Sequence, residues 1–114
     1  MRQIFTLFKK PGIFLLLFIS AAWPGVEGQA SHEVDVSNYE FDPDEITIQE
    51  GDTVVWTNSE GSHNVNGSQS VFASNPESFG NDVGTGWVYS HVFTVAGTYD
   101  YQCDPHASLG MTGR

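Results

Sequence analysis

Short runs in which apolar and polar residues alternate are the feature that most restricts the fold of this chain. Val34 and Val36 alternate with acidic residues, Ile46 and Ile48 alternate with polar ones, and apolar side chains fill every second position of residues 98–103. A period of two residues is that of a β-strand with one buried face. Asp-Pro-Asp and Glu-Gly-Asp turns separate the runs, and no helical period of useful length follows residue 30. The pattern predicts an all-β domain.

The stretch from Gly61 to Gly86 lacks this alternation and is rich in glycine, serine and asparagine. It predicts long loops, with at most one short strand or helical turn near residues 71–73. Loops of this length in a compact domain often carry function. Because neither a repeat nor a second domain is visible, residues 31–114 are expected to form a single domain.

Residues 1–30 are predicted to be a secretory signal peptide. Three basic residues precede an apolar run from residue 13 to residue 23, and small residues follow the run. The run is shorter than the roughly 20 apolar residues of a membrane span. Cleavage after Gly28 and cleavage after Ala30 both fit, and an uncleaved N-terminal anchor is the alternative. Cleavage would leave an exported domain, in the periplasm or outside the cell, without a membrane span.

The predicted mature part is strongly acidic. Residues 31–114 contain thirteen acidic residues and one basic residue, Arg114, which gives a formal charge of −12. Binding to nucleic acid requires lysine and arginine at the phosphates, so this class of partner is excluded. The charge would steer positively charged partners toward the protein. Solubility, or life in high salt, is the alternative explanation of the same charge.

The candidate functional residues are one thiol, two imidazoles and one thioether. Cys103, His106 and Met111 lie within nine residues of one another, and His63 follows the predicted strand 53–58. Two histidines, one cysteine and a weak axial methionine are the ligand set of a type 1 copper site. A structural zinc site is the alternative, but methionine is a poor zinc ligand and the chain has a single cysteine. That single cysteine also excludes a disulfide framework within the chain.

Residues 33–111 resemble the plastocyanin-like blue-copper (cupredoxin) family. The segments that carry the resemblance are Phe41-Asp42-Pro43, Gly51 to Asn58, Ser62-His63-Asn64-Val65 and Phe93 to His106, with the gap of four residues before Met111. The resemblance implies a Greek-key β-sandwich that holds one copper ion. It implies His63, Cys103 and His106 as strong ligands and Met111 as the axial ligand. It further implies that Asn64 ties the His63 segment to the Cys103 loop.

Two features depart from the family pattern. The family continues after the methionine with a closing strand, whereas this sequence ends three residues after Met111. We therefore expect a sandwich that lacks its last strand, in a domain truncated at its C-terminus. Asp104 stands where plastocyanins often have a small hydroxyl residue, and its carboxylate is expected to lower the reduction potential of the metal.

The predicted function is one-electron transfer between redox partner proteins that have a basic docking surface, and not enzyme catalysis. The resemblance implies that His106 is the ligand nearest to solvent, with Ala107, Leu109 and Gly110 in an apolar docking patch. The alternative is a copper-binding module that forms the N-terminal part of a larger exported or surface protein. Copper storage or delivery fits less well, since Met111 is the only methionine besides Met1. His91 is expected to be structural.

Overall fold

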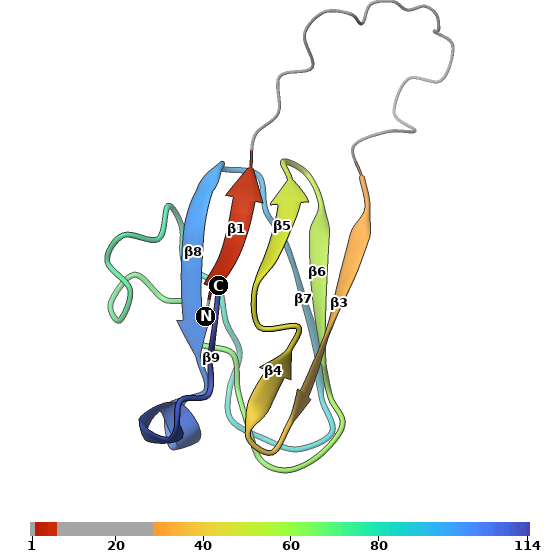
Figure 1. Cartoon of the computed structure of the whole chain (residues 1–114), viewed down its shortest axis with the longest axis vertical. Coiled ribbons are helices and arrows are strands. Elements are labelled where there is room, and N and C mark those ends of the chain that lie inside the picture. Colours follow the sequence, from red (N-terminus) through yellow and green to blue (C-terminus); the bar gives the residue numbers. More distant parts are fainter. Residues whose placement is uncertain (1, 7–28) are drawn as a thin grey trace, which may run out of the picture.

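A computed structural model of the chain describes residues 2–6 and 29–114. These residues form two β-sheets of four strands each that face one another, as Figure 1 shows. The all-β sandwich expected from the alternating sequence pattern is confirmed. Most of the predicted signal peptide, residues 7–28, lies outside the described residues. No helix in the described part of the chain is long and apolar enough to cross a bilayer.

One sheet has the strand order β4-β3-β6-β7. Its strands are β3 (Ser31–Ser37), β4 (Glu40–Asp42), β6 (Thr53–Asn58) and β7 (Val88–Val92). Strand β3 runs parallel to β6 and antiparallel to β4, while β7 runs antiparallel to β6. Every second side chain of β6 is buried, as the two-residue period requires. The inner face of this sheet therefore supplies one half of the core.

The other sheet has the strand order β5-β1-β8-β9. Its strands are β1 (Arg2–Thr6), β5 (Ile46–Gln49), β8 (Gly97–Gln102) and β9 (Thr112–Gly113). A 3₁₀ helix, η2 (Asp104–Leu109), connects β8 to β9. The closing strand that the sequence was expected to lack is represented by the two residues of β9, which pair with Tyr101 and Gln102.

Strands β1 and β9 lie one after the other along β8, on the side that faces β5. Strand β1 pairs with residues 97–100 of β8, and β9 pairs with Tyr101 and Gln102. Both run antiparallel to β8. The amide of Arg114 donates to the carbonyl of Asp44, and the amide of Ile46 donates to the carbonyl of Arg114, while β1 pairs with the rest of β5 and β8. The two ends of the chain consequently lie side by side (Figure 1). Cleavage of a signal peptide would remove β1 from this sheet, so the signal peptide stays a prediction.

The core between the sheets is aromatic and is centred on Trp56, which is fully buried. The indole stacks on Tyr89 and Phe79 with ring centroids 5.5 and 5.7 Å apart, and it meets Tyr101 of the opposite sheet edge to face at 5.5 Å. Offset and edge-to-face contacts of this kind add to the stability that burial of the rings supplies. They fix the distance between β6 and β8, the strand that leads into Cys103.

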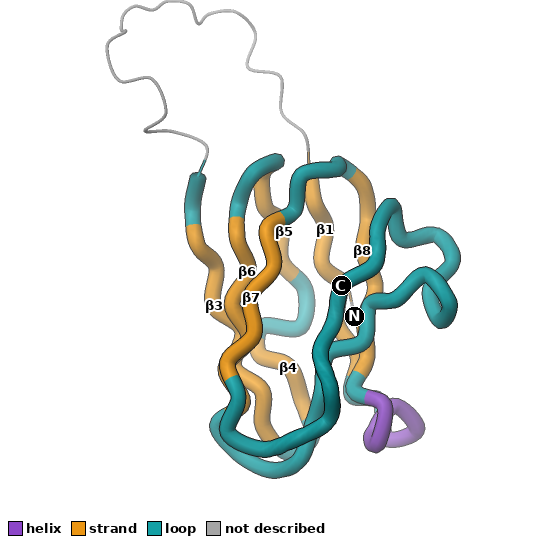
Figure 2. Tube along the Cα trace, turned by 180° about the vertical axis from the view of Figure 1, so that it is seen from behind, coloured by secondary structure: helices purple, strands orange, loops and turns teal. Residues whose placement is uncertain are grey.

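The segment between β6 and β7, residues 59–87, follows the surface of the sandwich without forming a strand, as expected for this stretch, and is shown as loop in Figure 2. It is nevertheless anchored at several points. The side chain of Asn75, which is 2% exposed, donates to the carbonyls of Gly67 and Asp100 and accepts from the amide of Asp100. These bonds attach the loop to β8 and hold its first half beside the end of that strand.

Asp52 anchors the turn between β5 and β6, and its carboxylate is 3% exposed. It accepts hydrogen bonds from the amides of Ala30 and Gln49 and contacts the ring of His32 at 2.9 Å. Burial alone would raise the pKa of Asp52, but these hydrogen bonds and the charge of His32 outweigh it and hold the pKa below the ordinary 3.8. The ionised carboxylate therefore stabilises the folded state.

We expect Asp52→Asn to lower the free energy of unfolding at about pH 7 by about 1–3 kcal/mol, because buried donors lose their charged acceptor. A depressed pKa in the folded state gives stability above the ordinary pKa of 3.8, and this stability is lost as the pH falls through the folded-state pKa. Urea unfolding at a series of pH values should therefore show a smaller acid-induced loss for the variant than for the wild type. Glu50→Gln, at an exposed neighbouring acid, is the control. Parallel pH curves for Asp52→Asn and wild type would contradict this account.

Candidate metal centre

Cys103 lies directly after β8, at the end of the molecule where η2 begins. Tyr99, Tyr101 and Cys103 share the buried face of this strand, so the thiol is carried into the interior by the alternation that the sequence predicted. The side chain of Cys103 is fully buried and forms no disulfide. A strand that is paired on both sides thus fixes the position of the thiol.

The loop after Cys103 closes back on it. Pro105 stands in the first turn of η2, where its missing amide proton costs no hydrogen bond. The helix ends at Gly110, whose φ of +87° lies in the left-handed region that favours glycine. The amide of Met111 then donates to the carbonyl of His106, and the amide of Cys103 donates to the carbonyl of Met111. These bonds hold the cysteine, the histidine and the methionine in one compact loop.

His63 reaches the same end of the sandwich from the loop that follows β6. Its backbone exchanges two hydrogen bonds with Gly84, and the indole of Trp87 donates to its carbonyl over 2.8 Å. The side-chain amide of Asn58 donates to the carbonyls of Gly61 and Gly84 and so joins the beginning of this loop to its later part. His63 is fully buried. Backbone hydrogen bonds thus fix the position of His63, although it lies in a long loop.

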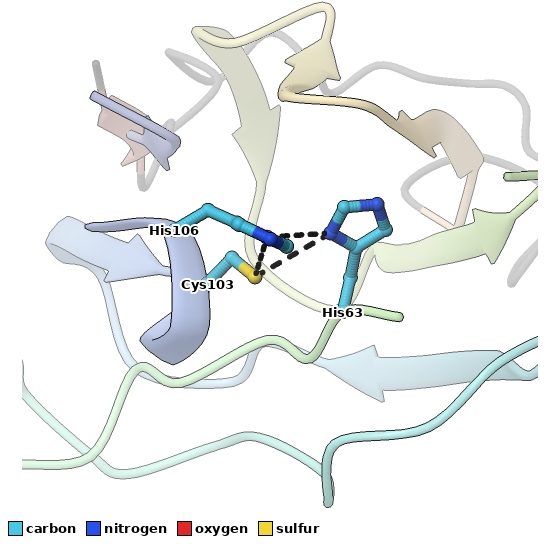
Figure 3. A group of neighbouring side chains, drawn as sticks. All are labelled: His63, Cys103 and His106. Atoms are coloured by element: carbon cyan, nitrogen blue, oxygen red, sulfur yellow. Dashed lines mark hydrogen bonds between the residues drawn. The ribbon is translucent and has the colours of Figure 1, made fainter. Parts of the chain in front are cut away.

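Three donor atoms converge at this point, as Figure 3 shows. Nδ1 of His63 lies 3.1 Å from Nδ1 of His106, and Sγ of Cys103 lies 3.6 and 3.4 Å from these two nitrogens. A point equidistant from the three atoms is about 2 Å from each, which compares with roughly 2.0–2.1 Å for metal–imidazole and 2.3 Å for metal–thiolate bonds in zinc sites. Within the described residues, no other group of three or more such side chains is found.

Met111 and Asn64, the two remaining predicted site residues, lie in the segments that carry the three donor atoms. Met111 is fully buried, and its backbone bonds place it beside Cys103 and His106. The side-chain oxygen of Asn64 accepts a hydrogen bond from the amide of Asp104 over 2.8 Å, which joins the His63 segment to the Cys103 loop. The residues therefore fit a metal ion held by two nitrogens and a thiolate, with a thioether in the same loop.

The environment disfavours charge on His63 and Cys103. Burial, with the nearby ring of His106 adding to it and Glu60 opposing it, lowers the pKa of His63. Burial raises the pKa of the Cys103 thiol; the charge of Asp104 adds to this effect, and backbone groups of Asn64 and His106 oppose it. The imidazole is thus kept neutral and able to bind a metal, and a bound cation would displace the thiol proton.

The other two histidines of the described chain lie away from this group. His91 faces Glu77 across the edge of the core, with Nε2 3.6 Å from Oε1, and has the structural position expected for it. His32 contacts Asp52 as described above.

Several residues of the site were not identified from the sequence. The ring of Tyr39, 52% exposed, lies 4.7 Å from the ring of His106, between solvent and the half-buried imidazole. Trp87 holds the backbone of His63. Both come from parts of the chain with no spacing relation to the ligand motif, so no sequence signal pointed to them. Leu109, which was expected in an apolar patch near His106, is 64% exposed.

In metal-free protein at about pH 8, we expect Cys103 to react with iodoacetamide more slowly than in the urea-unfolded chain, because burial raises the pKa of the thiol and the thiolate is the reactive form. The reaction is followed by mass spectrometry. Since Cys103 is the only cysteine, the unfolded chain is an internal control. Equal rates in the two states would show that the thiol is not shielded.

Comparison with known proteins agrees with this geometry. The family described as copper binding proteins of the plastocyanin/azurin family matches residues 28–114. Plastocyanin of Scenedesmus fuscus is 38% identical over 79 residues, which are 64% of this chain and 81% of that protein. Amicyanin of Paracoccus denitrificans is 38% identical over 74 residues, which are 64% of this chain but only 56% of that protein.

The solved structures show the same similarity in three dimensions. An amicyanin variant in its Cu(I) form superimposes with a TM-score of 0.60 at 33% identity, covering 73% of this chain and 77% of that one. The resemblance inferred from the ligand motif is therefore confirmed over most of the described residues. The chain belongs to the copper-binding plastocyanin/azurin family of cupredoxins.

Proposed function

We propose that this protein holds one copper ion at His63, Cys103, His106 and Met111 and carries single electrons between redox partner proteins outside the cytoplasm. The observation that carries the proposal is the convergence of two imidazole nitrogens and one buried thiol within 3.6 Å of one another. Thiolate and thioether are soft ligands that suit Cu(I), and imidazole suits copper in general. When bound, copper supplies a one-electron redox couple.

The protein's part in electron transfer is to keep the donor atoms in place. Cys103 is fixed by β8, His63 by Gly84 and Trp87, and the loop from Cys103 to Met111 by its own hydrogen bonds. Donor atoms that cannot move leave little rearrangement to accompany a change of metal charge. Four protein ligands also leave no open coordination position for a substrate. The arrangement therefore suits an electron carrier better than an enzyme.

Electrons would pass through the half-buried edge of His106. This ring is the most accessible of the three donor groups that converge in the site. The exposed side chains of Tyr39 and Leu109 lie near it and offer an apolar contact surface for a partner. The acidic residues of the domain favour a partner with a basic docking surface, because opposite charges accelerate encounter.

Export is the location that fits both the leader sequence and this chemistry. The predicted signal peptide, residues 1–30, would direct the domain to the periplasm or outside the cell. The described residues contain no membrane-spanning helix. N-terminal sequencing of the exported protein would test this part of the proposal: a mature chain that starts after Gly28 or Ala30 supports it, and one that still begins at Met1 contradicts it.

The copper site is tested by the visible spectrum. We expect wild-type protein with added Cu(II) to show an intense blue charge-transfer band that Cys103→Ser abolishes, since the band requires a thiolate ligand. His91→Gln, a change at a histidine outside the group, is the matched control and should keep the band. A colourless wild type, or a band that survives Cys103→Ser, would overturn the proposed function.

Charge steering is tested by ionic strength. Oxidation of the reduced protein by a cationic cobalt complex should slow as salt is raised from about 0.01 to 0.5 M, while oxidation by anionic ferricyanide should accelerate. The reason is that the Debye length falls over this range from about 30 Å to a few ångströms and screens the formal charge of −12 on residues 31–114. Stopped-flow absorbance of the blue band measures both rates. Rates independent of salt would show that the acidic surface does not steer redox partners.

A further inference from the structure

The carboxylate of Asp104 accepts hydrogen bonds from three side-chain amides. Asn64 Nδ2 donates to it over 3.0 Å, Asn66 Nδ2 over 2.9 Å and Gln102 Nε2 over 2.9 Å. A second contact of Asn66, at 3.2 Å, reaches the other carboxylate oxygen. Asp104 is exposed, so this group lies at the rim of the metal centre rather than within it.

The donors come from both segments that carry candidate ligands. Asn66 follows His63 by three residues, whereas Gln102 and Asp104 flank Cys103. The backbones of the two segments also pair at this point: the amide of Asn66 donates to the carbonyl of Gln102 over 2.8 Å, and the amide of Gln102 donates back over 3.0 Å. The carboxylate therefore reinforces the joint between the two segments.

The cluster places a carboxylate among neutral amide donors, next to Cys103 in the chain. Hydrogen bonds to a charged acceptor are about twice as strong as neutral ones. Three amide N–H groups point at the Asp104 carboxylate, and donors of this kind favour its ionised form, the ordinary form of an aspartate at neutral pH. Neutral amides order the carboxylate without cancelling its charge. A fixed negative charge near a metal favours the more positive state of that metal.

We propose that Asp104, ordered by Asn66 and Gln102, is a positioning residue of the metal centre: it holds the His63 and Cys103 segments at their spacing, and its charge favours the oxidised state of bound copper. The inference rests on the proposed function and deepens it. It concerns the carboxylate and its two outer amides, in addition to the bond between Asn64 and the backbone of Asp104.

The test compares three variants of the whole protein loaded with copper. Asp104→Asn removes the charge and puts an amide group among amide donors. Asn66→Ala keeps the charge but removes the donor on the His63 segment. Asp82→Asn is the control, because Asp82 is an exposed acid that lines the same surface cavity as Asp104 and its loss changes the net charge equally. For each protein, the reduction potential and the rate of copper removal by a chelator are measured.

We expect Asp104→Asn to raise the reduction potential above that of the control and to release copper about 10–100-fold faster, the range typical of lost outer-shell bonds. Asn66→Ala should also release copper faster, with a smaller shift of potential because the carboxylate remains. Asp82→Asn should behave as the wild type in both measurements.

The outcomes separate this inference from the proposed function. A wild type without a blue band overturns both. A blue wild type whose potential in Asp104→Asn does not exceed that of the control overturns the role of the charge. Copper release from Asp104→Asn and Asn66→Ala at the control rate overturns the role in positioning. If Asp104→Asn does not fold, the release rate of Asn66→Ala decides the matter, since that variant keeps the carboxylate.

Discussion

The backbone pairing between Asn66 and Gln102 is the contact on which the metal centre depends. Strand β8 and the loop after β6 are distant in sequence, and this two-bond bridge is where they meet beside the donor atoms. From it, the chain continues in one direction to Cys103 and, in the other, returns to His63. Because His63 lies three residues from Asn66 and Cys103 lies next to Gln102, a small error in the geometry of the bridge would displace these two donors relative to one another. The surrounding amides of Asn64 and Asn75 hold the same joint from either side.

The β-sandwich excludes water from the buried donor groups, which the pairing of Asn66 with Gln102 could not do alone. Trp56 and Tyr101 pack against one another in the core, and His63 and Met111 are fully buried. In this setting an uncompensated charge is costly, and burial lowers the pKa of His63 and raises the pKa of the Cys103 thiol. The same burial that keeps the thiol protonated makes a bound cation the favourable way to ionise it. Burial of Cys103 in the core thus contributes both to the packing of the protein and to the proposed binding of a metal.

Much of this was predictable because the relevant signals are local. The alternation of Tyr99, Tyr101 and Cys103 predicts a strand that buries the thiol, and the spacing of Cys103, His106 and Met111 predicts a loop that returns to it. The contacts of Tyr39 and Trp87 with the two histidines were not predictable, since they depend on how the loops cross the end of the sandwich. Strand β1 was not expected either: its residues read as a basic leader, and only the space between β5 and β8 gives them a place in a sheet.

The acidic residues act at two distances, and the physics differs between them. The total charge of the domain is felt by a partner through water and salt, so its effect weakens once the Debye length falls below the separation, about 8 Å at physiological ionic strength. Asp104 directly follows Cys103, so its charge acts on the site over a short distance and partly through protein, where screening is weaker. Added salt should therefore weaken the proposed attraction of a basic partner more than the proposed effect of Asp104 on bound copper.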